Sequence, residues 1–222
     1  MKTKKIVVFD LDDTLYNEID YLKSAFNEIA VKISNKININ KDAINDKMLD
    51  YFYSNKNVFL EIIKAYNLQF TVEELLSIYR KHQPNISLSE DRISVLNNLK
   101  KANIDLALLT DGRSIQQRSK IRALRLNRWF SEIVISEEFG SEKPNINNYK
   151  HFEKMFGEGV YYYVGDNIGK DFVSPNKLNW TTICLKNNGL NIHKQDEETV
   201  NEEYFAQKTI TEFLQLKEII NQ

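Results

Sequence analysis

Cysteine, glycine and proline, the residues that form disulfides, turns and flexible linkers, are scarce in this 222-residue chain. Its single cysteine, Cys184, excludes an internal disulfide and a cysteine-based metal site. With only 7 glycines and 3 prolines, the composition provides no flexible linker. Long apolar runs are missing too, since the longest early one, Ile6 to Phe9, is far too short for a signal peptide or a membrane-spanning helix. We therefore expect a cytoplasmic protein without a membrane partner.

An excess of charge of either sign is also absent, because 30 lysines and arginines against 31 aspartates and glutamates leave a net charge of −1. This balance gives no overall basic signal for nucleic acid, so we expect no nucleic-acid partner and look for local charged sites. Hydrophobic residues make up 42% of the chain, which is enough for the core of one domain, with or without a modest insertion. We expect a monomer or a homodimer.

The order of apolar patterns predicts an α/β core that is interrupted after its first strand. The continuous apolar run Lys4–Phe9 is typical of a strand buried on both faces of a parallel sheet. From about Tyr16 to Leu88 the spacing is helical, and a capping-box pair, Thr71 with Glu74, opens the last of four expected helices. Strands then alternate with helices, which indicates a parallel sheet. The expected strands are Ile104–Leu109, Glu132–Ile135, Val160–Val164, Thr181–Leu185 and Lys208–Ile210, and the expected helices are Glu90–Lys101, Ser114–Leu126, Ile146–Phe156 and Thr211–Ile220.

Acidic residues follow the first strand directly. Asp10 and Asp12 lie where an open α/β sheet binds its ligands, beyond the carboxyl ends of the strands. A calcium loop is excluded, because it would need glycine at Leu15 and glutamate at Tyr21. A plain acidic turn is the other alternative, and we disfavour it because three further strand ends also carry chemical groups.

Two of these strand ends offer groups that suit an anion. Thr110 supplies a hydroxyl after its strand, and the backbone amides of Asp111 and Gly112 come from an expected helix start. Taken alone, this Asp-Gly pair would more readily indicate a strand-to-helix turn. Lys143 stands immediately before a proline and an expected helix, and taken alone it would be a solvated surface lysine.

The fourth strand end carries Asp166 and Asp171 on either side of Gly169. The spacing excludes a phosphate-binding P-loop, which needs four residues between its glycines and a serine or threonine where Asp171 stands. An acidic helix start would account for Asp171 but not easily for Asp166. We therefore expect a loop that turns both carboxylates toward one point.

Taken together, the strand ends hold four carboxylates that need a cation. Two carboxylates about 4 Å apart repel each other by about 4 kcal/mol at an effective dielectric constant near 20. Hard oxygen ligands of this kind suit Mg²⁺, which often bridges to phosphate. A Mg²⁺ site beside a lysine suits a phosphate dianion, and one carboxylate can then act as a covalent nucleophile.

In motif order and spacing, essentially the whole chain resembles the haloacid dehalogenase-like (HAD) hydrolase superfamily, in its subgroup with a helical cap inserted after the first motif. The first motif, D-x-D-x-T, is matched by Asp10, Asp12 and Thr14. The later motifs are matched in order by Thr110, Lys143, Asp166 and Asp171. The resemblance implies a three-layer Rossmann-like core with a parallel sheet, made of residues 1–15 and 89–222, and an all-helical cap domain of residues 16–88.

The resemblance also implies the role of each matched residue. Asp10 would attack phosphorus, and Asp12 would protonate the leaving oxygen and later accept a proton from water. The catalytic set would be Asp10, Asp12, Thr110 and Lys143, and the phosphate-binding set would be Thr110, Asp111, Gly112 and Lys143. The Mg²⁺ site would comprise Asp10, Asp12 through its backbone carbonyl, Asp166, and Asp171 either through water or by orienting the site.

The favoured function is therefore a Mg²⁺-dependent phosphatase that hydrolyses a small phosphorylated metabolite through an aspartyl-phosphate. A general acid at Asp12 favours this over the dehalogenases of the superfamily, whose halide leaves without a proton. Two alternatives stay open, a sugar-phosphate mutase of the same superfamily and a non-catalytic HAD-fold binding module.

Overall fold

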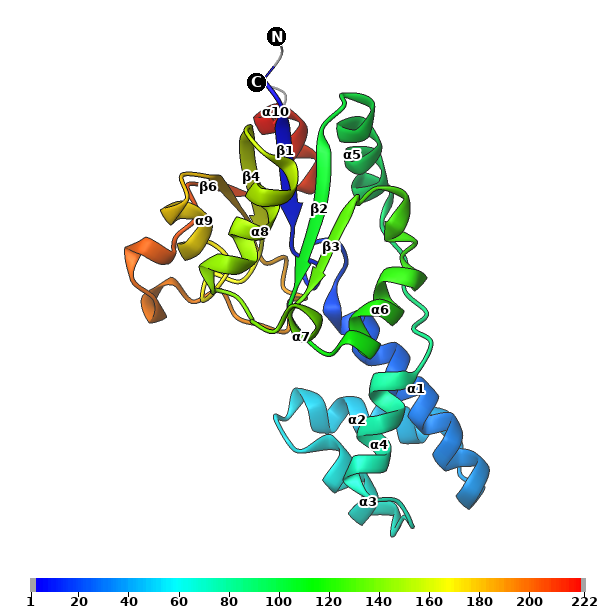
Figure 1. Cartoon of the computed structure of the whole chain (residues 1–222). Coiled ribbons are helices and arrows are strands. Elements are labelled where there is room, and N and C mark those ends of the chain that lie inside the picture. The colour runs from blue at the N-terminus through cyan, green and yellow to red at the C-terminus, as the bar shows by residue number, and fades with distance from the viewer. Residues whose placement is uncertain (1–2, 221–222) are drawn as a thin grey trace.

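Residues 3–220 are described by a computed structural model, whose central element is a six-stranded sheet (Figure 1). All neighbouring strands run parallel, in the order β3-β2-β1-β4-β5-β6. The strands are β1 (Lys5–Phe9), β2 (Asp105–Thr110), β3 (Glu132–Ile135), β4 (Val160–Gly165), β5 (Thr181–Leu185) and β6 (Lys208–Ile210). The prediction of an α/β fold with a parallel sheet is confirmed.

The register of the central strands places their carboxyl ends side by side. Phe9 of β1 pairs with Leu108 of β2 on one side and with Val164 of β4 on the other. The chain leaves β1 at this level, and the backbone amide of Asp10 still donates to the Val164 carbonyl at 2.8 Å. Because β1 connects to β2 on one side and neighbours β4 on the other, this edge is the switch point at which such sheets bind ligands.

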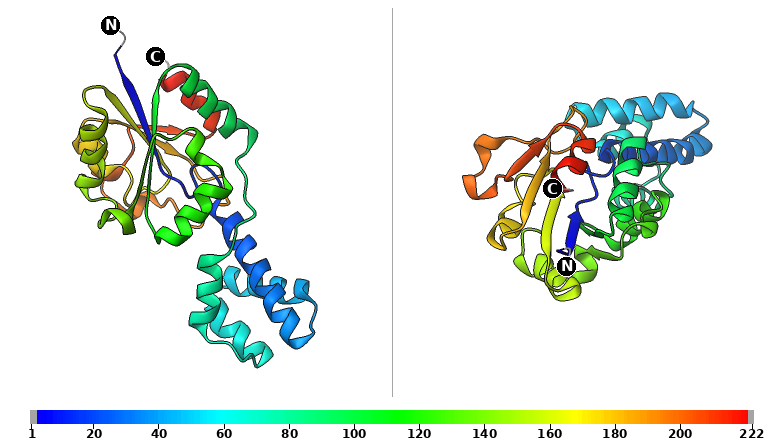
Figure 2. Two further views of the ribbon diagram at one scale, coloured as in Figure 1. Left: turned by 45° about the vertical axis from the view of Figure 1, so that its right-hand side comes forward. Right: turned by 90° about the horizontal axis from the view of Figure 1, so that it is seen from above.

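Both faces of the sheet are buried, which makes the core three-layered. Successive side chains of a strand point to opposite faces, so Val7 and Phe9 enter one hydrophobic cluster while Ile6 and Val8 enter another. Three helices supply the first cluster, α5 (Glu90–Lys101), α6 (Ser114–Ala123) and α10 (Leu216–Ile220). The second is covered by α8 (Ile146–Phe156) and the start of α9 (Val173–Lys177). Figure 2 shows these helices on the two sides of the sheet.

A unit of four helices lies between β1 and α5 and projects away from the sheet (Figures 1 and 2). Its helices are α1 (Glu18–Ile37), α2 (Lys41–Tyr53), α3 (Val58–Tyr66) and α4 (Val72–Lys81). They enclose their own hydrophobic cluster, which includes Phe26, Met48 and Ile62. The expected capping box is formed at the start of α4, where Thr71 and Glu74 each accept from the other's backbone amide.

Several element boundaries differ from those predicted. The second strand runs one residue later than expected, so Thr110 is its last residue and not a loop residue. Helix α6 stops at Ala123, three residues early, because Arg125 has a left-handed φ of 53° that a continuing helix cannot contain. The last helix begins at Leu216, after a 3-10 turn over Phe213–Gln215.

The remaining elements are short. They are α7 (Ser136–Phe139) and 3-10 turns at Leu126–Arg128, Glu197–Thr199 and Glu202–Tyr204. Among residues 3–220, no helix has both the length and the apolar character that crossing a bilayer requires.

Candidate active site

The carboxyl ends of β1, β2 and β4 surround a small polar cavity of about 100 Å³. Asp10 follows β1, Thr110 ends β2 and Asp166 follows β4, so the register of the sheet itself brings these three together. The other residues that line the cavity are Asp12, Asp13, Glu18, Asp111, Asn167, Lys170 and His193.

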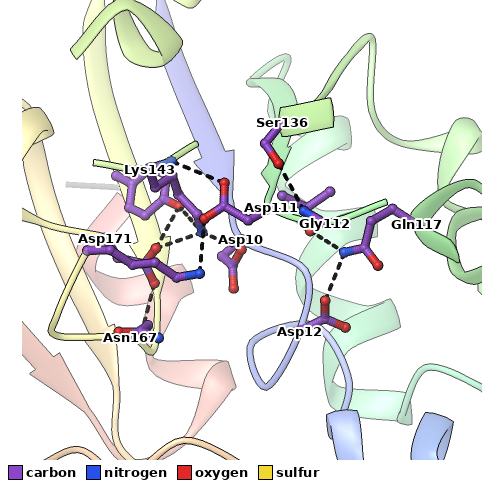
Figure 3. Close-up of polar contacts among 12 residues, drawn as sticks. Asp10, Asp12, Asp111, Gly112, Gln117, Ser136, Lys143, Asn167 and Asp171 are labelled. Carbon is purple, nitrogen blue, oxygen red and sulfur yellow. Dashed lines mark hydrogen bonds and ion pairs between the residues drawn. The ribbon is translucent and has the colours of Figure 1, made fainter. Parts of the chain in front are cut away.

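Lys143 lies between the carboxylates of Asp10 and Asp171 (Figure 3). Its Nζ is 2.6 Å from Asp10 Oδ1 and 2.7 Å from Asp171 Oδ1, and its side chain is 1% exposed. It also donates to the Tyr163 hydroxyl at 3.2 Å. Burial alone would lower the pKa of Lys143, but the charges of Asp10, Asp171 and Asp111 outweigh it and raise the pKa well above its usual value. The lysine is therefore a fixed cation.

One lysine does not balance the carboxylates around it. Asp10, Asp166 and Asp171 are buried, and one carboxylate oxygen of each lies within 4.8 Å of the others. Burial raises the pKa of Asp10 to about 7, with Lys143 opposing the rise. Burial, followed by the charges of Asp10 and Asp171, raises the pKa of Asp166 to about 9. Burial and the mutual repulsion of the carboxylates both disfavour their charged forms, and a hard divalent cation with oxygen ligands fits this donor set.

A close backbone approach holds Asp171 in this cluster. Its Oδ1 faces Lys143, and its Oδ2 accepts from the Asn167 amide at 2.9 Å. A side chain at Gly165 would place its Cβ 2.4 Å from Asp171 Oδ2. The loop after β4 thus turns Asp166 and Asp171 toward one point, as the sequence pattern predicted, and glycine at 165 permits it.

Asp12 has a different set of partners. Tyr16 Oη and Lys120 Nζ donate to its Oδ1 at 2.5 and 2.7 Å, and Gln117 Nε2 donates to its Oδ2 at 2.9 Å. Burial would raise the pKa of Asp12, but Lys120 and these hydrogen bonds outweigh it and hold the pKa below its usual value. The Asp12 carboxylate lies outside the metal-ligand cluster, so the sequence-based assignment of its backbone carbonyl as a ligand stays a prediction.

The segment expected to bind phosphate is only partly turned to the cavity. Thr110 lines the cavity and accepts from Gln117 Nε2 at 2.6 Å. The Gly112 amide, expected to face an anion, instead donates to Ser136 Oγ at 2.9 Å. The Asp111 carboxylate accepts from the Lys143 amide at 3.1 Å and from Lys170 Nζ at 3.0 Å, which ties two motifs together. The Gly112 amide lies in the turn before α6 and already has a partner in Ser136, so its assignment to phosphate stays a prediction.

Two groups of residues at the site escaped the sequence analysis. Gln117 and Lys120 stand three apart on α6, and both are buried on a mostly polar helix, which the structure shows and the sequence does not. The second group comes from the segment between β5 and β6. There Asn191 Nδ2 donates to Asp166 Oδ2 at 2.8 Å, and Gln195 Nε2 donates to the Asp166 carbonyl at 2.7 Å. This segment has no periodic pattern that predicts where it lies.

A larger hollow of about 630 Å³ lies beside Gly159 and Trp180, at the opposite end of β4. Its lining contains none of the residues that the sequence analysis assigned to the site. The volume of a cavity therefore does not locate the chemistry here.

Comparison with known proteins agrees with this geometry. The family model described as haloacid dehalogenase-like hydrolase matches residues 7–185. A glyceraldehyde 3-phosphate phosphatase of Methanocaldococcus jannaschii is 27% identical over 194 residues, covering 82% of this chain and 84% of its own. Another of that name, from Pyrococcus furiosus, is 28% identical and covers 99% and 94%.

Solved structures share the fold. The HAD-hydrolase YfnB of Bacillus subtilis, in a structure bound to magnesium, superposes with a TM-score of 0.68 at 19% identity, over 100% of both chains. A HAD phosphatase from Thermococcus onnurineus has a TM-score of 0.61 at 22% identity, over 97% of both chains. The chain belongs to the haloacid dehalogenase-like hydrolase family, which confirms the resemblance seen in its motifs.

Proposed function

We propose that this protein is a Mg²⁺-dependent phosphatase that uses Asp10 as a covalent nucleophile. The observation that carries the proposal is the placement of Asp10 at the floor of a polar cavity, held by Lys143 at 2.6 Å and neighboured by Asp166. Hydrolysis of a phosphoric monoester is the class of reaction that the family and the names of the curated relatives support.

The first step transfers the phosphoryl group to the protein. An oxygen of Asp10 attacks phosphorus, the bond from phosphorus to the leaving oxygen breaks, and its electron pair goes to that oxygen. Asp12, which must first take up a proton because Lys120 holds its pKa below the usual value, donates that proton to the leaving oxygen as a general acid. Lys143 keeps Asp10 ionised, and the Thr110 hydroxyl at the cavity wall donates to a phosphoryl oxygen.

The second step restores the nucleophile. Water attacks the phosphorus of the aspartyl-phosphate, the bond from phosphorus to Asp10 breaks, and the electron pair returns to the Asp10 carboxylate. The ionised Asp12 takes a proton from the attacking water, so the acid of the first step is the base of the second. Asp10, Asp166 and Asp171 would hold Mg²⁺, which supplies positive charge to the phosphoryl oxygens when bound.

We further propose that residues 16–88 form a cap over the cavity and that residues 1–15 and 89–222 form the catalytic core. Support comes from α1, which begins at Glu18, itself part of the cavity lining. Ile192, beside the cavity residue His193, packs against the hydrophobic cluster of the four helices. A cap in this place would exclude water and contact the leaving group.

The size of the cavity favours a small substrate. At about 100 Å³ it is smaller than the 300–1,000 Å³ typical of sites for drug-sized ligands. A three-carbon phosphate monoester suits such a space, and curated relatives are named glyceraldehyde 3-phosphate phosphatases. We therefore propose glyceraldehyde 3-phosphate and similar short phosphates as the first substrates to test.

The test is phosphate release from a panel of phosphorylated metabolites, measured with Mg²⁺, with EDTA and with the Asp10→Asn variant. We expect release that requires Mg²⁺ and is lost in the variant, with three-carbon phosphates ranking first. An isomerised sugar phosphate without free phosphate would identify a mutase instead. Tight binding that survives Asp10→Asn, with no turnover by the parent protein, would identify a binding module.

A further inference from the structure

A second buried lysine pairs with Asp12, as Lys143 pairs with Asp10. Lys120 is on α6, its side chain is 1% exposed, and its Nζ lies 2.7 Å from Asp12 Oδ1. Placing an ammonium in a protein interior is costly unless it is paired and hydrogen-bonded. Asp12 is therefore the main ion-pair partner of Lys120. The same ammonium also lies 3.5 Å from Glu18 Oε1.

Gln117 holds the other oxygen of the same carboxylate. Its Nε2 is 2.9 Å from Asp12 Oδ2 and 2.6 Å from Thr110 Oγ1, and the residue is 1% exposed (Figure 3). Gln117 and Lys120 are three positions apart, so one face of α6 presents both donors to the loop after β1. The two oxygens of Asp12 are thus held separately, and rotation of the carboxylate would break at least one contact.

Lys120 is itself held by the first helix of the four-helix unit. Its ammonium lies 4.6 Å from the centre of the Tyr21 ring, on α1, in addition to its contact with Glu18. Tyr21 in turn donates to the Tyr79 carbonyl of α4 at 2.9 Å. Lys120 therefore has two possible roles: it can orient the Asp12 carboxylate, and it can attach α1 to the core.

We propose that Lys120 and Gln117 are positioning residues, which fix the Asp12 carboxylate so that it can exchange protons with the leaving oxygen and then with water. This rests on the proposed phosphatase function. Neither residue touches the phosphoryl group in this role, so their removal lowers kcat without raising KM. The effect also depends on the leaving group, because a nitrophenolate departs without a proton whereas an alcohol needs one.

The experiment compares Lys120→Met with the parent enzyme in Mg²⁺, using glyceraldehyde 3-phosphate or another alkyl phosphate that the parent cleaves, and p-nitrophenyl phosphate. With the alkyl phosphate we expect kcat to fall at least about tenfold, within the factor of about 10²–10⁴ that general acid–base catalysis supplies. With the aryl phosphate we expect a fast burst of nitrophenol followed by slow turnover, because the aspartyl-phosphate then waits for its base. Arg122→Met removes an exposed cation from the same helix and should change neither.

A double-mutant cycle separates positioning from attachment of α1. In an Asp12→Asn background, Lys120→Met should change the remaining rate of phosphate release from the alkyl phosphate by no more than about twofold, since the carboxylate that it positions is gone. An equal loss in both backgrounds would overturn the proposal and leave Lys120 as a structural anchor. If Lys120→Met does not fold, Gln117→Met replaces it, because it removes one donor to Asp12 and keeps the ion pair. Gln117 also donates to Thr110, so a loss that is equally large in the Asp12→Asn background would be assigned to Thr110 and would overturn the positioning of Asp12.

The two possible failures can be told apart. A parent enzyme that releases phosphate from none of the substrates overturns the proposed function, and the role of Lys120 with it. An active parent whose rate is unchanged by both Lys120→Met and Gln117→Met overturns the positioning role alone.

Discussion

Gly165 shows how one residue can fix a catalytic geometry without contacting a substrate. A Cβ at this position would lie 2.4 Å from Asp171 Oδ2 and 3.1 Å from the Tyr163 ring. Asp171 is fully buried and pairs with Lys143, which in turn pairs with Asp10. A shift of Asp171 is therefore passed to the nucleophile through a single side chain.

We predict that Gly165→Ala destabilises the protein by about 1–3 kcal/mol, the usual cost of overpacking a filled site. It should also lower phosphatase activity more than this loss of stability explains. Urea unfolding and initial rates measure the two effects. Gly169→Ala is the matched control, because its Cβ would meet only the Asn167 side-chain oxygen, at 3.3 Å. Equal behaviour of the two variants would contradict this account of Asp171.

At the scale of elements, the start of α4 tests how the four-helix unit is held together. Thr71 accepts from the Glu74 amide at 3.1 Å, while Glu74 accepts from the Thr71 amide at 2.7 Å. Thr71→Ala should cost about 0.5–2 kcal/mol of unfolding free energy. Asn17→Ala, at a helix start with no side-chain capping bond, should cost less. Thermal unfolding of both variants measures the difference, and a larger cost for Asn17 would contradict it.

The segment between β5 and β6 donates hydrogen bonds to Asp166. Gln195 donates to the carbonyls of Asp166 and Leu185 at 2.7 and 2.8 Å, and accepts from the Asn187 amide at 2.7 Å. Removing it should cost about 1–3 kcal/mol in lost hydrogen bonds.

Gln195→Ala should also weaken Mg²⁺ binding by about 10-fold or more, because groups that orient a metal ligand affect affinity in this range. Isothermal titration with Mg²⁺ measures this change. Gln207→Ala is the control: Gln207 lies in the same segment and donates to the Trp180 carbonyl, and its hydrogen bonds go to residues other than Asp166. A Mg²⁺ affinity that falls equally in both variants would contradict a specific role for Gln195.

For the whole molecule, the excess of buried negative charge predicts that Mg²⁺ stabilises the fold. A ligand at 100 times its dissociation constant adds about 2.7 kcal/mol to the free energy of unfolding. For a chain of this length that corresponds to a rise in Tm of about 5–10 °C. Asp166→Asn should abolish the rise, and a full Mg²⁺ shift in that variant would contradict the placement of the metal.

How much of the structure could be predicted from the sequence depends on which features are local and which the whole fold creates. Five strands after the first and the strand-end residues Asp10, Thr110, Lys143 and Asp166 could be named, because apolar patterning and motif spacing are local signals. The contact of Lys120 with Asp12 joins positions 108 residues apart, and the fold alone brings them together. The bond of the Gly112 amide to Ser136 and the position of the segment around Asn191 were not predicted for a related reason, since turns and irregular segments are oriented by what they pack against.

The central claim is that Asp10 forms a covalent bond to phosphorus during turnover. The direct measurement is to quench the enzyme during turnover with Mg²⁺ and substrate, reduce it with borohydride, and map the product by peptide mass spectrometry. Reduction of an aspartyl-phosphate converts the residue to homoserine, and the account predicts homoserine at position 10. Phosphate release without any modification at Asp10, or homoserine at another aspartate, would contradict it.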